Sequence, residues 1–322
     1  MDLIYTDATG ADVGVLFGFS LDLAFGSEEN NFELTMSIDS NGIENDAFIY
    51  IYGTEYGGIV DGRRVDTEQQ MITYLGRSFH GILNSKVIQP PSGEAYLNIS
   101  GEANAAIDSI ISSLGLGSMF EVAATDSGIT LSDYQMDRYI KCYDGINKML
   151  KANGAKLAMS FVNGKVKLEA KEFVDYSQDE QYTSDHYALN IQKYSNKVNH
   201  LICLGSGELT ERQVVHLYVQ ADGSISTSTQ FFTGIDEYAD VFDYPNAESL
   251  EALEQYGRER LKELHNSDTA EMELYDDEAV LDINDKVGTT EEVTGTKITN
   301  SVVKKIVKIQ DDELKIEYKV GD

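Results

Sequence analysis

Alternating apolar and polar residues dominate the first ninety positions of the chain. One run places apolar side chains at every second position: Phe32, Leu34, Met36 and Ile38. Similar runs lie around residues 48–52 and 71–75. A period of two predicts strands with one buried face, and short strands separated by glycine-rich breaks are typical of a barrel or a sandwich. Pro90-Pro91 marks a boundary, because proline cannot continue a ladder.

The period becomes helical after this boundary. Apolar side chains recur at i, i+3, i+4 and i+7 in one segment: Ile107, Ile110, Ile111 and Leu114. The spacing predicts a helix with Asn104 as its N-cap and Gly115 just beyond its C-terminus. A second helix is expected from about Asp137 to the region of Gly154.

A β-hairpin is the clearest local signal in the chain. AKLAMSFV and KVKLEAKEF flank Asn163-Gly164, a dipeptide that supplies the two positive φ angles of a type I′ turn. Strand-like pattern resumes later in KVNHLICLGSG and VVHLYVQADG, where Asp222-Gly223 is another turn pair. Residues 92–185 are therefore expected to form an α+β unit inserted into a β-domain.

The last third of the chain begins with a helix and returns to strands. Asn246 is the expected N-cap of the helix, and Glu254 lies four residues before Arg258 on its surface. The fold class predicted is mainly β with an α+β insertion. The expected parts are a first β-barrel domain (1–91 plus about 186–245), the insertion (92–185), a helix packed on the barrels (246–267) and a second, smaller β-domain (268–322).

Charge excludes one class of function. The chain has 322 residues, with 25 Lys+Arg and 55 Asp+Glu, which gives a net charge of −30. Nucleic-acid binders neutralise phosphates with a basic surface, and the largest basic cluster here is Lys304, Lys305 and Lys308. Anionic membranes are disfavoured for the same reason. The N-terminus lacks a signal-peptide pattern, and no apolar run reaches membrane-spanning length, so synthesis in a cytoplasm is expected.

Candidate catalytic and metal-binding patterns are weak. The two cysteines, Cys142 and Cys203, are expected to be separate buried thiols in a helix and a strand. Local spacing does not predict a zinc site from the histidines, His80, His186, His200, His216 and His265.

Three motifs come close to known functional patterns. The stretch from Gly76 to Gly81 resembles a nucleophile elbow around Ser78, but His80 stands where that turn requires glycine. Gly205-Ser206-Gly207 lacks the third glycine and the basic residue of a phosphate loop. The calcium-like set Asp282, Asn284 and Asp285 is better interpreted as a turn. We therefore predict no catalytic, cofactor-binding or metal-binding residues.

The chain resembles the siphophage tail-hub proteins, which are related to contractile-tail baseplate hubs and to the base of type VI spike proteins. The resemblance rests on the order and spacing of segments along nearly the whole chain: ITYLGRSFHGILNSKVIQPP, KVNHLICLGSGELTERQVVHLYVQADG, FDYPNAESLEALEQYG and the closing DINDKVGTTEEVTGTKI, IVKI and LKIEYKVG.

This resemblance implies two small barrels similar to tail-tube subunits, the first interrupted by an α+β domain. It also implies a homotrimer that forms a pseudo-sixfold ring at the virion tail tip, between tail-tube or distal-tail proteins and tip-fibre proteins. DNA would pass through the ring without specific binding, and no enzyme activity or cofactor is implied. The alternative is a tail-associated cell-wall hydrolase that uses Ser78 or a carboxylate pair.

Overall fold

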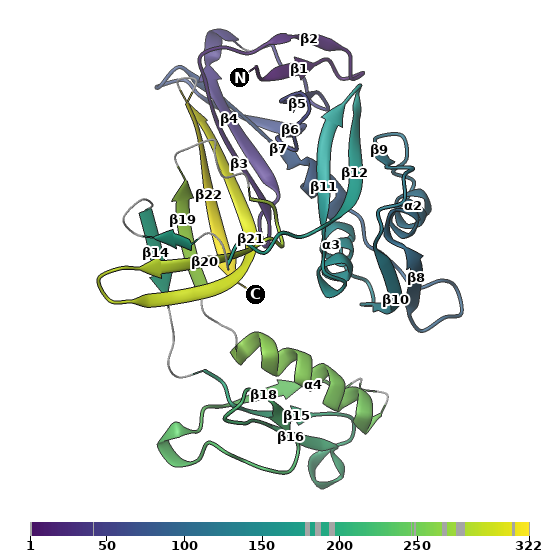
Figure 1. Ribbon diagram of the computed structural model, residues 1–322. Coiled ribbons are helices and arrows are strands. Elements are labelled where there is room, and N and C mark those ends of the chain that lie inside the picture. The colour runs from purple at the N-terminus through teal and green to yellow at the C-terminus, as the bar shows by residue number, and fades with distance from the viewer. Residues whose placement is uncertain are drawn as a thin grey trace. The chain divides into compact units, whose positions relative to one another are not determined.

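The chain folds into two compact units in the computed structural model (Figure 1). The first consists of Met1–Asn190 and Glu271–Val320, and the second of Ile191–Ala270. The structure describes residues 2–40, 42–177, 181–183, 188–192, 197–245, 247, 249–265, 269–274, 281–310 and 313–321.

One large, open sheet forms the base of the first unit. The order of its strands is β14-β19-β22-β21-β3-β4-β7-β6-β5-β1-β2, and β20 pairs with β21 and β13 with β20. The N-terminal strands are β1 (Ile4–Thr6), β2 (Asp12–Val15), β3 (Phe19–Gly26), β4 (Asn31–Ser37), β5 (Phe48–Tyr50), β6 (Gly57–Asp66) and β7 (Met71–Ser78). The later strands are β13 (Gln181–Thr183), β14 (Ala188–Gln192), β19 (Thr269–Leu274), β20 (Lys286–Glu291), β21 (Thr296–Gln310) and β22 (Glu313–Gly321).

Alternating burial explains the centre of this sheet. Leu21, Leu23 and Phe25 of β3 are buried, and so are the apolar residues predicted for β4: Phe32, Leu34 and Met36. Ile38, the last member of the predicted run, begins a short 3₁₀ turn, Ile38–Ser40, after β4 has ended. The predicted N-terminal strands are therefore confirmed.

An inserted α+β layer follows β7 and packs on the sheet. Phe79 and Ile82 of the first helix share a core with Ile107, Ile146 and Phe161 of the insertion, and the Phe79 and Phe161 rings stack 5.2 Å apart. Its two small sheets have the orders β10-β8 and β11-β12-β9. The elements are α1 (Phe79–Asn84), β8 (Leu97–Glu102), α2 (Ala103–Ser113), β9 (Phe120–Val122), β10 (Thr130–Met136), α3 (Cys142–Ala152), β11 (Ala155–Val162) and β12 (Lys165–Glu172).

Local predictions for this layer are mostly confirmed. Asn163 and Gly164 have φ values of 54° and 75°, as a type I′ turn requires, and Val162 pairs with Lys165. Gly115 follows α2 with a φ of 70°. Glu102, however, caps α2, because its carboxylate accepts hydrogen bonds from the N–H groups of Asn104 and Ala105. Similarly, α3 begins at Cys142 and not near Asp137.

The second unit is a four-stranded sheet covered by a helix. The strand order is β17-β16-β15-β18, and Leu253 and Leu261 of the helix share a core with Leu201 and Leu217 of the sheet. The elements are β15 (His200–Leu204), β16 (Val214–Val219), β17 (Ile225–Ser226), β18 (Ala239–Asp243) and α4 (Leu250–His265), with 3₁₀ turns at Leu209–Glu211 and Gly234–Asp236.

Two predicted features of α4 have different outcomes. The pair of Glu254 and Arg258 is present, with 2.8 Å between the guanidinium and the carboxylate. The predicted N-cap, Asn246, lies outside the described residues, and the Ser249 hydroxyl accepts a hydrogen bond from Ala252 N–H at the start of the helix.

The strand pairings differ from the predicted division in two places. The expected first barrel included residues 186–245, but β15, β16 and β18 pair among themselves. The expected separate domain after residue 268 is part of the first sheet, since Lys304 to Gln310 of β21 pair with Gly26 to Ser20 of β3. Alternation identifies the buried face of a strand but not its partner, which explains the error.

The predictions of the fold class and of the two cysteines are confirmed. The fold is mainly β with an α+β insertion, although no pairing among the described strands closes a sheet into a barrel. Cys142 and Cys203 are buried, unpaired thiols at the start of α3 and in β15. No helix in the described part of the chain is long and apolar enough to cross a bilayer.

Candidate functional site: a buried charge cluster in the first unit

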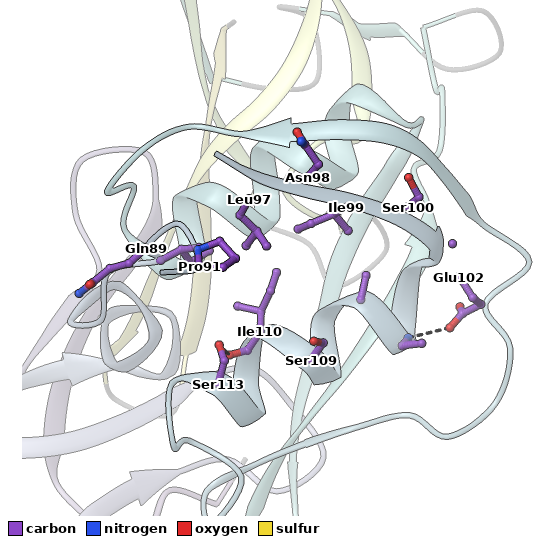
Figure 2. Close-up of a pocket in the computed structure, with 14 residues that line it drawn as sticks. Gln89, Pro91, Leu97, Asn98, Ile99, Ser100, Glu102, Ser109, Ile110 and Ser113 are labelled. Atoms are coloured by element: carbon purple, nitrogen blue, oxygen red, sulfur yellow. Dashed lines mark hydrogen bonds between the residues drawn. The ribbon is translucent and has the colours of Figure 1, made fainter. Parts of the chain in front are cut away.

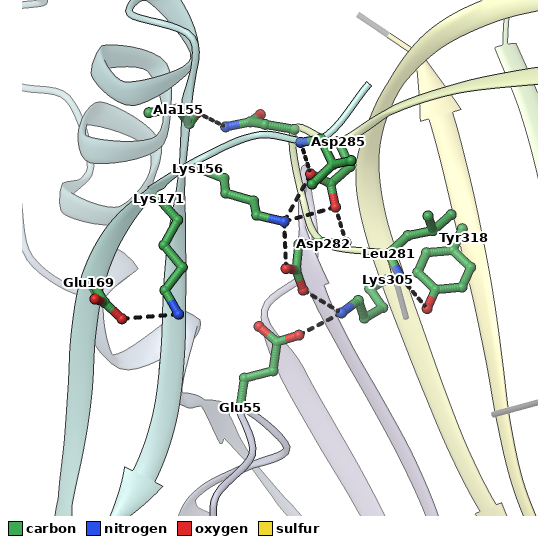
Figure 3. A network of polar contacts seen from close by, with 12 residues as sticks. Glu55, Ala155, Lys156, Glu169, Lys171, Leu281, Asp282, Asp285, Lys305 and Tyr318 are labelled. Carbon is green, nitrogen blue, oxygen red and sulfur yellow. Dashed lines mark hydrogen bonds and ion pairs between the residues drawn. The ribbon is translucent and has the colours of Figure 1, made fainter. Parts of the chain in front are cut away.

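Lys305 is the centre of a buried charge cluster. It lies in β21 opposite Phe25 of β3, and its side chain is fully buried. The ammonium donates to Glu55 Oε1 at 2.6 Å and lies 3.4 Å from Asp282 Oδ1 (Figure 3). Three aromatic rings surround it, with centroids 5.6 to 5.8 Å away: Phe25, Tyr56 and Tyr318. Cation–π attraction at these distances adds to the ion pair.

Glu55 connects the β5–β6 loop to helix α1. Its second oxygen lies 3.5 Å from His80 Nε2, and the His80 ring stacks on Phe25 with 4.1 Å between centroids. His80 is buried, and its Nδ1 has no hydrogen-bond partner among the described residues. The histidine is held by ring packing and by Glu55.

A second lysine extends the cluster into the inserted layer. Lys156 of β11 donates to both oxygens of Asp285 at 2.9 Å and pairs with Asp282 at 2.7 Å. Asp285 is fully buried and also accepts hydrogen bonds from the N–H groups of Val174 and Asp282. Neighbouring Asn284 donates to Ala155 O at 3.2 Å. The turn before β20 is therefore fixed to β11 by several independent contacts (Figure 3).

Electrostatics keep the central groups charged. Burial raises the pKa of Glu55, but the neighbouring Lys305 ammonium and His80 more than offset it and hold the pKa at about 2. Burial lowers the pKa of Lys305, yet the Glu55 carboxylate and other nearby groups raise it well above its ordinary value. The pKa of Lys156 is raised too, because Asp282 and Asp285 outweigh burial. Neither lysine can serve as a neutral amine nucleophile near neutral pH, so the cluster is suited to holding segments together.

The same arrangement explains the basic run in β21. Lys304 pairs with Glu29, Lys305 with Glu55 and Lys308 with Glu317. Each lysine of the cluster found in the sequence is thus neutralised within the chain, which removes it as a phosphate-binding surface.

The structure assigns other roles to the three near-miss motifs. Ser78 is fully buried, and its hydroxyl accepts a hydrogen bond from Gly81 N–H at 3.3 Å as the N-cap of α1. This burial disfavours the hydrolase alternative built on Ser78. Gly205 N–H donates a hydrogen bond to Gln213 O, and Gln213 N–H donates one to Ser206 O, in the hairpin between β15 and β16. The set from Asp282 to Asp285 forms the expected turn. The Lys156 ammonium pairs with the carboxylates of Asp282 and Asp285, which the calcium-like pattern would have assigned to a metal ion.

His200 and His216, which local spacing in the sequence did not pair, lie in contact in the second unit. His200 Nε2 and His216 Nδ1 are 2.9 Å apart, and His200 Nδ1 lies 2.5 Å from a Glu237 carboxylate oxygen. The pair is diagonal across the β15–β16 hairpin, whose register local spacing does not reveal. Within the described residues, no group of three or more ligating side chains could hold a metal ion. His186 lies outside the described residues, and His265 bonds to Val198 O.

Solved structures, and not sequence comparisons, show which known proteins this chain is similar to. No protein-family model matches the chain, and no curated protein matches it. Among solved structures, the 43 kDa tail protein of a Shewanella oneidensis prophage superposes with a TM-score of 0.61 at 14% identity, covering 99% of this chain and 98% of its own. The chain shares the fold of prophage tail proteins.

Two further structures agree. The tail protein from Neisseria meningitidis has a TM-score of 0.59 at 12% identity, with coverage of 100% of this chain and 96% of its own. A Listeria monocytogenes prophage tail protein has a TM-score of 0.53 at 13% identity, with coverage of 99% and 94%. The resemblance to phage tail proteins expected from the sequence is thereby confirmed at the level of the fold.

Proposed function

We propose that the protein is a structural component of a phage or prophage tail, located at the tail tip. The observation that carries the proposal is similarity over almost the full length of both chains to solved tail proteins. The candidate site supports the same conclusion, because Lys305 and Glu55 form a buried ion pair that joins distant segments. We infer that the chain is not an enzyme and needs no cofactor.

In this proposal three copies form a ring that joins the tail tube to the tip. The large sheet is open, and β2 at one end of its strand order carries exposed apolar residues on or beside it: Val13, Val15 and Phe17. An exposed sheet edge of this kind is normally protected by pairing or packing, and closed cyclic assembly provides that protection. The partners are further copies of the chain, tail-tube or distal-tail proteins, and tip-fibre proteins.

The acidic composition suits a ring through which DNA passes. A net charge of −30 repels phosphates over a Debye length of about 8 Å at physiological salt. An acidic run from Asp268 to Glu278 has side chains outside the described part of the structure. The proposal includes an acidic bore on the basis of this net charge.

Antibody labelling of purified tails under the electron microscope tests the location. We expect label at the tip and, by quantitative mass spectrometry, three copies per tail. Label along the tube, or a different copy number, would contradict the tip ring. A peptidoglycan zymogram should show no clearing, and a clear band would instead support the cell-wall hydrolase.

A further inference from the structure

A groove of about 740 Å³ crosses the inserted layer between β8 and α2 (Figure 2). The residues from Leu97 to Glu102 line one wall, and Gln89 and Pro91 close one end. Helix α2 forms the other wall. The groove shares no lining residue with the buried charge cluster, and the proposed tail-tip assembly assigns it no role.

Strand β8 offers a free hydrogen-bonding edge to this groove. It pairs antiparallel with β10 on one side, and no other strand in the described part of the chain pairs with it. Leu97 and Ile99 extend from the strand toward Ile110 of α2, whereas Asn98 points away (Figure 2). The strand thus presents unpaired backbone groups together with an alternating apolar surface, the combination on which an added strand assembles.

The opposite wall leaves room for such a strand. Small side chains, Ala105, Ser109 and Ser113, recur every fourth residue of α2 along the groove. A strand residue occupies about 160 Å³, from a strand spacing of about 4.8 Å, a rise of about 3.3 Å and a layer spacing of about 10 Å. The groove therefore has space for about four or five residues, which approaches the six-residue length of β8.

Charge at the end of the groove restricts what can enter. Burial raises the pKa of Glu102, but Ser127 and three backbone N–H groups more than offset it and hold the pKa at about 2. Glu102 already occupies the N-terminus of α2 through Asn104 N–H and Ala105 N–H. A terminal carboxylate cannot take that position, and acidic side chains are repelled by the local carboxylate and by the net charge of −30.

We propose that the groove binds an extended, non-acidic internal segment of a partner protein, which adds to the free edge of β8 as a third strand. Alternate side chains of this segment face Ala105, Ser109 and Ile110, and a basic side chain lies near Glu102. Main-chain hydrogen bonds supply affinity, and the shallow, small-residue wall selects short apolar side chains.

Three fluorescent heptapeptides test the proposal on the full chain: acetyl-TVSVTVK-amide, its glutamate-ended counterpart acetyl-TVSVTVE-amide, and the proline-interrupted acetyl-TVPVTVK-amide. Anisotropy should show saturable binding of the lysine-ended peptide and at least tenfold weaker binding of the other two. Hydrogen exchange should show protection of β8 amides when the first peptide is bound.

Paired variants on α2 locate the binding. Ser109→Trp fills the groove, and Ser112→Trp is the matched control, because Ser112 is exposed on the same helix but does not line the groove. We expect at least a tenfold loss with Ser109→Trp and no change with Ser112→Trp, at unchanged melting temperatures. Ser113→Trp serves as a second blocking variant if Ser109→Trp unfolds.

Three results would overturn the inference. The first is an absence of saturable binding by all three peptides up to millimolar concentration. The second is binding that the blocking variants leave unchanged, or that does not discriminate between the lysine- and glutamate-ended peptides. The third is a dimer that forms without peptide and is lost in Ser109→Trp, which would identify a second copy of this chain as the occupant.

Discussion

Lys305 and Glu55 are 250 positions apart in the chain and form an ion pair of 2.6 Å inside the first unit. The pair connects β21 near the C-terminus to the β5–β6 loop near the N-terminus. Asp282 and Lys156 continue the same network into the inserted layer. The contacts between the C-terminal strands, the N-terminal sheet and the insertion therefore depend on charges that are satisfied only when all three segments are in place.

Removing one partner of this pair should lower the free energy of unfolding much more than removing both. Glu55→Gln leaves the buried Lys305 ammonium with a single carboxylate at 3.4 Å, and we expect a loss of about 3 to 5 kcal/mol in the free energy of unfolding. The double variant Glu55→Gln/Lys305→Met should recover much of this loss, because no buried charge is left unpaired. Urea denaturation of the single and double variants measures the coupling. Additive single-variant effects would show that the two side chains do not act as a pair.

Acid should destabilise the first unit through Glu55. Its pKa is about 2 in the folded chain against an ordinary value of 4.5. A folded pKa below the unfolded one contributes stability that is complete above about pH 4.5 and disappears as the pH falls toward 2. The difference corresponds to about 3 kcal/mol. Urea midpoints between pH 5 and pH 2.5 should fall less steeply for Glu55→Gln than for the wild type, and parallel curves would contradict this assignment.

The hairpin of the inserted layer can be tested at its turn. Gly164 has a φ of 75°, and a β-branched residue there is strained, so Gly164→Val should cost about 1 to 2 kcal/mol. Asn163→Gly is the control, since glycine adopts the φ of 54° at that position without strain. Thermal melts of both variants test whether the turn is type I′. An unchanged melting temperature for Gly164→Val would mean that the turn differs from type I′ in solution.

The Asn163-Gly164 turn could be predicted because its signal is local. Two neighbouring residues determine the turn, and the flanking strands are its immediate neighbours in sequence. The pairing of β3 with β21 had no such signal, because alternation marks the buried face of a strand and does not identify its partner. Register across a long loop is decided by tertiary packing.

The burial of charged side chains was the second feature that the sequence did not predict. The sequence groups Lys304, Lys305 and Lys308 as a basic cluster, which is ordinarily interpreted as solvent-exposed. Lys305 is instead fully buried, because Glu55, Phe25 and Tyr56 from distant segments and Tyr318 from the next strand surround it. One available signal was the position of two consecutive lysines inside the apolar strand SVVKKIVKI, where one of them has to face the core.

Close packing of α4 on its sheet gives a prediction for the second unit. A Cβ atom added at Gly257 would lie 2.4 Å from Cys203 Sγ and 2.8 Å from Leu217 Cδ1. Glycine-to-alanine changes inside helices usually stabilise by up to about 1 kcal/mol, but Gly257→Ala should lower the melting temperature. Gln255→Ala on the exposed side of α4 is the control. Cys203→Ala should partly rescue Gly257→Ala, and a lack of any rescue would mean that Leu217 alone sets the limit.

Assembly of the proposed ring should depend on salt. Each copy carries a net charge of −30, so bringing three copies together is opposed by repulsion that salt screens over a Debye length of about 10 Å at 0.1 M and about 3 Å at 1 M. We expect the isolated chain to be monomeric at low ionic strength and to shift toward a trimer as salt and protein concentration rise. Light scattering across a salt and concentration series measures the shift. Association that weakens with salt would instead indicate that attractive ion pairs hold the copies together, and a stable dimer or tetramer would contradict the threefold ring.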